Sequence, residues 1–181
     1  MSRAKSKQPK YEITVMIDLS KLSSRYSTRI LDDSDVDIIL DLCLGNPQFY
    51  ESVPAQPTAE EIRNDMTVLP PGIEPEDKYY FGFFEERELV AVMDLIDGYP
   101  DPETAYIGFF MMNRKYQGRH IGSAIISEAA DRLREMGKTA IRLGIDKENP
   151  QSVHFWNKNG FAVIREADMG GWTALVAERK L

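Results

Sequence analysis

The hydrophobic pattern of the chain changes sharply near its middle, and this change limits the folds that the chain can adopt. Three runs rich in aromatic and branched residues come first, at 78–86, 88–96 and 104–112. From residue 121 to 136, apolar residues instead recur every three or four positions. The first pattern predicts antiparallel core strands, and the second predicts an amphipathic helix that Gly137 ends. A sheet that runs directly into a long helix is therefore the centre of the predicted fold.

The remaining segments extend this sheet. Four further strands are predicted, at 25–31, 139–145, 161–167 and 172–181. Three further helices are predicted, at 32–45, 57–66 and 149–160. Thr58 and Glu61 have the spacing of a capping box, and Asn149 is placed to cap the last helix. The order β-α-α-β-β-β-α-β-α-β-β predicts a mixed α/β (α+β) domain over 25–181, with residues 1–24 as a partly disordered extension.

Composition narrows the class of protein. The 181 residues suffice for one domain, and a net charge of −7 disfavours a nucleic-acid binder. No apolar run is long enough to cross a membrane, and the basic N-terminus lacks the apolar core of a secretory signal. We therefore expect a cytoplasmic protein without nucleic-acid or membrane partners. The sequence does not determine the oligomeric state and leaves a homodimer open.

Cysteine and histidine are scarce. Cys43 is the only cysteine, which excludes an internal disulfide and a cysteine metal cluster. His120 and His154 are the only histidines, and they lack the carboxylate spacing of a metal site. We expect no metal. Because Cys43 falls on the apolar face of a predicted helix, we do not expect it to be a nucleophile.

A glycine-containing loop precedes the long helix. In "QGRHIGS", Gln117 to Ser123, backbone amides at the start of a helix can bind a phosphate group. The loop matches neither the Walker pattern nor the dinucleotide-binding fingerprint. The alternative is that Gly118 and Gly122 only let the chain turn.

Two segments carry a resemblance. The loop resembles the Q/R-x-x-G-x-G/A motif of the GNAT N-acetyltransferase superfamily, with Gln117 first, Gly122 last and His120 where that family usually has glycine. Residues 149–161 resemble the family's N-x-x-A-x-x-F-Y-x-K-x-G-F segment. Five residues there match the segment: Asn149, Phe155, Lys158, Gly160 and Phe161. Ser152 replaces the family's alanine, and Trp156 replaces its tyrosine.

This resemblance implies a GNAT-like fold, with a mostly antiparallel sheet that splays between 104–112 and 139–145 and has helices on both faces. It also implies acetyl-CoA as co-substrate, with its pyrophosphate on the loop amides and its pantetheine beside 109–112. The cofactor-binding residues implied are Phe110, Met111, Met112, Gln117, Gly118, Arg119, His120, Ile121, Gly122, Ser123, Asn149 and Trp156. The reaction implied is acetyl transfer to a primary amine of a small molecule or peptide, by direct attack in a ternary complex.

The sequence leaves the catalytic groups open. A backbone N–H near Phe110 is the expected donor to the thioester oxygen. Trp156 cannot act as a titrating acid, and a core role is the alternative for it. Asp94 stands inside an apolar strand, where a carboxylate is costly unless it is paired or functional, and Tyr106 falls where several family members carry glutamate.

Other candidates stay open as well. Asp97 and Glu103 lie at a polar turn, where solvated carboxylates are usual, and a water chain is a further route for the proton. Two functional alternatives also remain. One is a catalytically silent CoA-binding regulatory domain, suggested by His120 and Trp156, and the other is a protein N-acetyltransferase.

Overall fold

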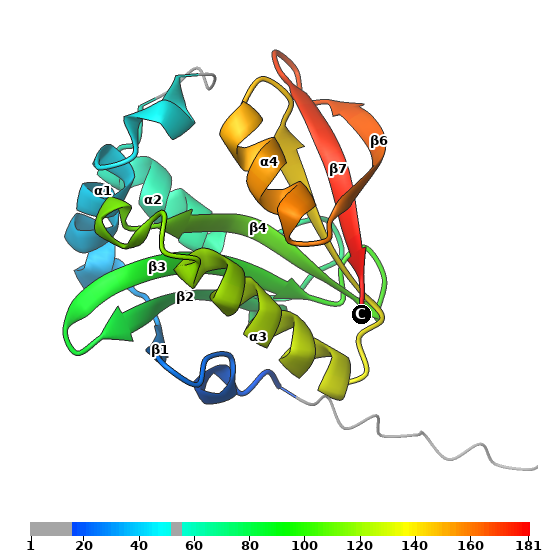
Figure 1. Cartoon of the computed structure of the whole chain (residues 1–181), viewed down its shortest axis with the longest axis horizontal. Coiled ribbons are helices and arrows are strands. Elements are labelled where there is room, and N and C mark those ends of the chain that lie inside the picture. The colour runs from blue at the N-terminus through cyan, green and yellow to red at the C-terminus, as the bar shows by residue number, and fades with distance from the viewer. Residues whose placement is uncertain (1–15, 52–55) are drawn as a thin grey trace, which may run out of the picture.

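A single seven-stranded sheet carries helices on both of its faces (Figure 1). The computed structural model describes residues 16–51 and 56–181. The strands are β1 (Ser27–Ile30), β2 (Lys78–Glu85), β3 (Glu88–Asp97), β4 (Thr104–Met112), β5 (Ala140–Asp146), β6 (Ala162–Asp168) and β7 (Thr173–Lys180). Their order is β1-β2-β3-β4-β5-β7-β6, and only β4 and β5 are parallel neighbours. The predicted mixed α/β fold with a mostly antiparallel sheet is confirmed.

The α-helices differ in how they begin, and two of them start at a side-chain cap. They are α1 (Val36–Leu44), α2 (Ala59–Thr67), α3 (Ile121–Glu135) and α4 (Pro150–Lys158). Thr58 and Glu61 form the predicted capping box, and the Asn149 side chain accepts a hydrogen bond from the Ser152 amide. Short 3₁₀ helices are η1 (Leu19–Lys21), η2 (Asp33–Asp35), η3 (Pro47–Tyr50), η4 (Pro75–Asp77) and η5 (Arg114–Tyr116). Among the described residues, no helix has both the length and the apolar composition to span a membrane.

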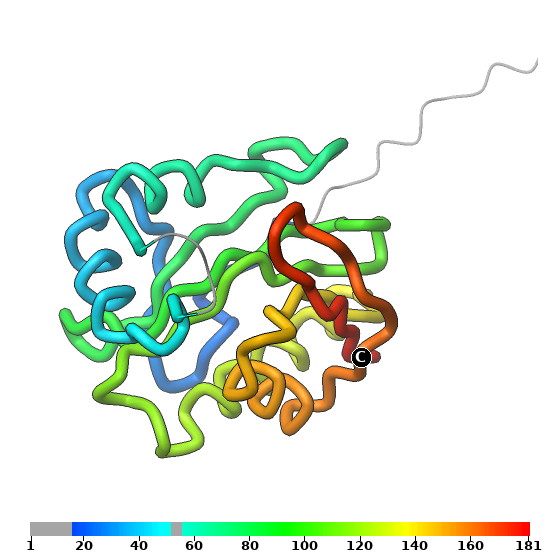
Figure 2. Tube along the Cα trace, turned by 90° about the horizontal axis from the view of Figure 1, so that it is seen from above, coloured from blue at the N-terminus to red at the C-terminus, as the bar shows by residue number. Residues whose placement is uncertain are grey.

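The sheet divides the core into two apolar clusters. On one face, α3 buries Ile125 and Leu133 against strand residues that include Met93. On the other face, α1 and α2 pack against Val92 and its neighbours. Val92 and Met93 thus point to opposite faces, as the predicted strand alternation requires. Figure 2 shows α1 and α2 at one end of the molecule, and α4 with the β6–β7 hairpin at the other.

The sheet splits in its centre. β4 pairs with β5 only from Thr104–Ala140 to Ile107–Leu143, after which β4 continues beside β3 and β5 continues beside β7. At the same point the β3–β4 register shifts, because Asp94 pairs with Phe109 while Leu95 pairs with Ile107. Gly108 is the extra residue, which makes this a β-bulge. The splay implied by the family resemblance is therefore present.

The sequence pattern placed the start of the domain at residue 25, but residues that belong to the folded core begin earlier in the chain. Ile17 and Leu22 are buried in the cluster under α3. The Ile17 amide donates to the Tyr79 hydroxyl at 3.2 Å, and the Thr28 hydroxyl donates to the Leu19 carbonyl at 2.7 Å. The segment from Ile17 to Leu22 therefore covers an edge of the core. The expectation of disorder for residues 1–15 lies outside the described residues.

A truncation tests whether this segment contributes to stability. Leu22→Ala removes a fully buried side chain, and we expect it to lower the free energy of unfolding by about 2–5 kcal/mol. Lys21→Ala is the matched control, since Lys21 is exposed and should change that energy by less than about 0.5 kcal/mol. Urea denaturation of both variants measures the difference. Equal stabilities would show that the segment is not part of the cooperative core.

Candidate functional site

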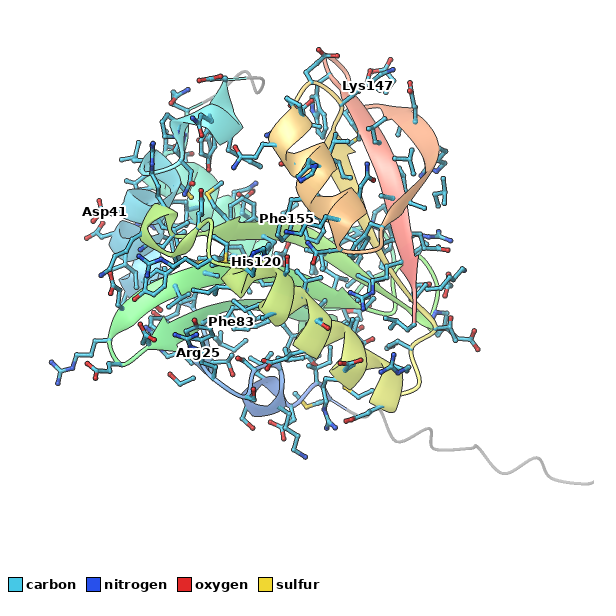
Figure 3. All side chains as sticks on the ribbon, viewed as in Figure 1. Arg25, Asp41, Phe83, His120, Lys147 and Phe155 are labelled. Atoms are coloured by element: carbon cyan, nitrogen blue, oxygen red, sulfur yellow. The ribbon has the colours of Figure 1, made fainter. Side chains whose placement is uncertain are left out.

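A cleft of about 330 Å³ lies beside the split in the sheet. Its walls come from the second half of β4, the loop before α3, the N-terminal part of α3, η3 and α4. Figure 3 shows His120, just before α3, and Phe155, on α4, near each other at the centre of the molecule, and both line the cleft. Segments distant in sequence thus enclose one space.

Most residues predicted to bind the cofactor lie around this cleft. Those that line it are Phe110, Met111, Met112, Gln117, Gly118, His120, Ile121, Gly122, Ser123, Asn149 and Trp156. Arg119 is exposed and is not among them. Asp94 and Tyr106 also lie outside the lining. The cofactor roles of these residues remain predictions.

The start of α3 offers backbone amides to the cleft. Ile121, Gly122 and Ser123 form the first turn, whose amides have no acceptor inside the helix, and no side chain caps them from His120. His120 has φ of +60°, a left-handed conformation that favours glycine, which accounts physically for the glycine that the family usually has there. Lys158 Nζ lies 3.3 Å from His120 Nδ1 and adds a cation at the rim of the cleft.

The two glycines of the loop have different tasks. Gly118 has φ of +72° and open space around it, so it serves the turn. Gly122 is helical, and a Cβ there would lie 3.2 Å from Phe155 Cε2 and 3.4 Å from Met112 Cγ. Its small size therefore lets α3 approach α4 and β4 closely.

Asn46 links the loop before α3 to the sheet through hydrogen bonds, a role that the sequence pattern did not indicate. Gln117 Nε2 donates to Asn46 Oδ1 at 2.6 Å and to the Met112 carbonyl at 3.1 Å. Asn46 Nδ2 donates to that same carbonyl at 3.1 Å and to the Leu42 carbonyl at 2.9 Å. The two amide side chains thus join the end of α1, the end of β4 and the loop. Only a contact across 71 residues identifies this role, and no local motif signals it.

The second half of β4 presents a backbone edge without a neighbouring strand. Within residues 16–51 and 56–181, β4 beyond Ile107 has strand partners only in β3, and no strand pairs with its side toward β5. Backbone groups in such a position need another partner, which a bound molecule can supply. This edge and the amides of α3 border the same cleft.

Trp156 is packed as an aromatic core residue. It is 8% exposed, and its ring lies 5.0 Å from both Phe155 and Phe161 and 5.9 Å from Phe110, measured between ring centroids. The same ring borders the cleft. Its surroundings agree with the core alternative and leave no ionisable group at this position.

Asp94 has a partner that the sequence pattern did not identify. Both of its carboxylate oxygens lie 2.7 Å from Lys78 Nζ, on the face of the sheet that α1 and α2 cover. Burial raises the pKa of Asp94, and the Lys78 ammonium opposes that rise. The sequence left Asp94 as either paired or functional; the structure shows the pairing, with Lys78, and a catalytic role for Asp94 stays a prediction.

Tyr106 is unsuited to act as a base. Burial raises the pKa of its phenol above the ordinary value, so the hydroxyl stays protonated at neutral pH. Its ring packs edge-on against Tyr99 with a centroid distance of 5.4 Å. Asp97 forms an ion pair with Lys138.

Cys43 is buried on α1, and burial raises the pKa of its thiol. A buried, protonated thiol is a poor nucleophile, in line with the expectation from sequence. Within residues 16–51 and 56–181, no three His, Cys, Asp or Glu side chains are grouped so that they could hold a metal ion.

One family of known sequences matches most of the chain. The sequence profile described as "Acetyltransferase (GNAT) family" matches residues 44–161. This range includes the loop before α3, all of α4 and Asn46. A comparison with the sequences of curated proteins gives no match.

Solved structures share the fold. An acetyltransferase from Thermus thermophilus has a TM-score of 0.67 and 21% identity, over 86% of this chain and 96% of that chain. The PaiA N-acetyltransferase from Thermoplasma acidophilum, in complex with coenzyme A, has a TM-score of 0.62 and 19% identity, over 86% and 98%. The Salmonella typhimurium acetyltransferase that modifies the N-terminal serine of ribosomal protein L7/L12 has a TM-score of 0.68 and 18% identity, over 88% and 97%.

The amide pair Asn46–Gln117 yields a prediction for cofactor binding. Asn46→Ala removes the acceptor of Gln117 Nε2 and one donor to the Met112 carbonyl, so the loop is held less firmly. We expect the Kd for acetyl-CoA, measured by calorimetry, to rise about fivefold or more. Asn46→Ala/Gln117→Ala should lose no more than the larger single loss, since the residues act as one unit.

Asn157→Ala serves as the control, because Asn157 is exposed on α4 and does not line the cleft. Its affinity should match that of the natural chain. Independent, multiplicative losses at Asn46 and Gln117 would contradict the proposed coupling.

Proposed function

The chain belongs to the acetyltransferase (GNAT) family, whose co-substrate is acetyl-CoA, and we propose on that premise that it acetylates a primary amine of a small molecule or peptide. The amine attacks the thioester directly while both substrates are bound. One observation carries the proposal: the unpaired edge of β4 and the first-turn amides of α3 border the same cleft.

The residues of this cleft fit the parts of acetyl-CoA. The first-turn amides and the positive end of the α3 dipole suit a pyrophosphate, with His120 and Lys158 as further donors. The β4 edge suits the amide groups of a pantetheine arm, which can pair with it as an additional strand does. Phe110, Phe155 and Trp156 give the cleft an apolar wall that excludes water.

Charge develops on the thioester oxygen as the amine attacks. A backbone N–H near Phe110, where β4 has left β5, is the proposed donor to that oxygen. Such a donor needs no change of protonation state and is held by the sheet. The remaining requirement is a route for protons.

We assign the proton of the amine to water rather than to a carboxylate. A lysine-like ammonium has a pKa near 10.4, so about one molecule in a few thousand is neutral at pH 7. No Asp or Glu is among the described residues that line the cleft, Asp94 is held by Lys78, and the phenol of Tyr106 stays protonated. The departing thiolate, with a pKa of roughly 8.5, is a tolerable leaving group without an acid.

Release of CoA thiol tests the function. Acetyl-CoA is supplied with polyamines, amino acids, aminoglycosides and peptides with free N-termini, and thiol release is followed against an amine-free blank. We expect stimulated release with at least one primary amine. Stimulation by peptides alone would identify a protein N-acetyltransferase. Acetyl-CoA binding without stimulated release from any amine would favour a silent binding domain.

His120 can be tested without disturbing the loop. Glycine adopts φ of +60° without strain, so His120→Gly removes the imidazole while the backbone path is kept. We expect unchanged or higher thermal stability and a Kd for CoA that rises about three- to tenfold, through loss of a charge-assisted hydrogen bond. Titration with dephospho-CoA separates a 3′-phosphate contact from a pyrophosphate contact. Unchanged affinity for both ligands would remove His120 from the binding site.

Trp156→Tyr restores the residue that the family usually has. The smaller ring leaves space among Phe110, Phe155 and Phe161, and we expect a stability loss of about 1–3 kcal/mol. Steady-state kinetics with one identified amine should give a kcat within about twofold of the natural chain, since the thiolate leaves unaided. A large gain in kcat would instead show that protonation of the thiolate limits the natural enzyme.

A further inference from the structure

A buried ion pair lies under the centre of the sheet, away from the residues that line the cleft. Lys78 and Asp94 have side chains that are 4% and 10% exposed, and Nζ lies 2.7 Å from both carboxylate oxygens. Removing two charges from water is unfavourable, and such a pair is weak support for stability by itself. Its position therefore calls for another explanation.

The Asp94 carboxylate fills the space in which a side chain at residue 108 of the neighbouring strand β4 would lie. A Cβ on Gly108 of β4 would lie 2.5 Å from Asp94 Oδ2 and 3.2 Å from its Cγ. Gly108 does not have a positive φ, so its backbone conformation does not demand glycine. The absent side chain is instead required by the carboxylate, which Lys78 holds in place.

Gly108 also lies where the β3–β4 register shifts and the pairing between β4 and β5 ends. It is the extra residue of the bulge between the Asp94–Phe109 and Leu95–Ile107 pairs. The last β4–β5 pair is Ile107–Leu143, directly before it. Gly108 is solvent-exposed although it lies in a central strand. A bulge changes the direction of the backbone groups that follow it, which here belong to the free edge of β4.

We propose that Lys78 and Asp94 are positioning residues for acetyl transfer, which fix the bulge at Gly108 and thereby aim the free edge of β4 at the thioester. The pair acts through Gly108 and touches neither substrate. This inference rests on the proposed function for its catalytic consequence. The claim that the ion pair fixes the bulge depends only on the contacts of Lys78, Asp94 and Gly108, and not on the proposed function.

A variant cycle separates this role from general stabilisation. Gly108→Ala places a methyl group against the carboxylate, and we expect kcat to fall about tenfold or more, because small displacements of reacting groups carry large rate losses. Lys78→Met/Asp94→Ala should also lower kcat, since nothing then fixes the bulge. In that background the new methyl group would lie 3.7 Å from Cβ of residue 94, an ordinary contact. Adding Gly108→Ala there should change kcat by less than about twofold.

The control is a second ion pair with a buried carboxylate, at the edge of the same sheet. Arg29 binds Asp35 through two contacts of 2.7 Å near the edge strand β1. Asp35→Asn should lower the melting temperature and leave kcat unchanged. The Kd for acetyl-CoA should stay within about twofold of the natural value in Asp35→Asn. In the Gly108 and Lys78/Asp94 variants the fall in kcat should exceed any rise in that Kd, because the β4 edge also carries the proposed pantetheine contacts.

A spectroscopic measurement keeps the inference testable if the natural chain acetylates no amine in the panel. Amide ¹H–¹⁵N shifts of Gly108, Phe109 and Phe110 should move in Lys78→Met and stay in place in Asp35→Asn. Unmoved shifts in Lys78→Met would overturn the inference whether or not the chain is active. Multiplicative effects of Gly108→Ala and Lys78→Met/Asp94→Ala on kcat would overturn it as well.

Discussion

Backbone polar groups in the middle of a sheet need partners, and among the described residues the second half of β4 has strand partners on one side only. The four residue pairs between β4 and β5 end at Ile107–Leu143. From there the Met112 carbonyl accepts from Asn46 and Gln117, and the other N–H and C=O groups on that side have no strand partner among the described residues, so a ligand can supply one. The position of the cleft, the free edge and the cofactor proposal all follow from this break in pairing.

Much of the fold could be predicted because its signals are local. The alternation around Val92 and Met93, the helical repeat in α3 and the caps at Thr58 and Asn149 all depend on residues a few positions apart. Each gave an element close to the observed one. The position at which the packed chain begins was missed, because Ile17 and Leu22 form no repeat and acquire their partners only when β2 and α3 are folded around them.

The site was predictable to a lesser extent, for the same reason. The loop before α3 and the cap at Asn149 are contiguous motifs, and both segments border one cleft. Asn46 and Lys78 carry no motif; their importance depends on partners at Gln117 and Asp94 that only the folded chain brings near. The single inserted residue at Gly108 also shifts by one position which β4 residues face each side of the sheet. Counting along the sequence cannot detect this shift.

The four pairs between β4 and β5 have a consequence for the stability of the whole molecule. Two groups of strands, β1–β4 and β5–β7, are joined by only these four residue pairs, so a molecule lying along the split would extend the contacts between them. A ligand that binds only the folded chain raises its stability by RT ln(1 + [L]/Kd), about 2.7 kcal/mol at a hundred times Kd. Acetyl-CoA bound along the split would therefore stabilise the folded chain in addition to supplying the acetyl group, and the melting temperature would rise with its concentration.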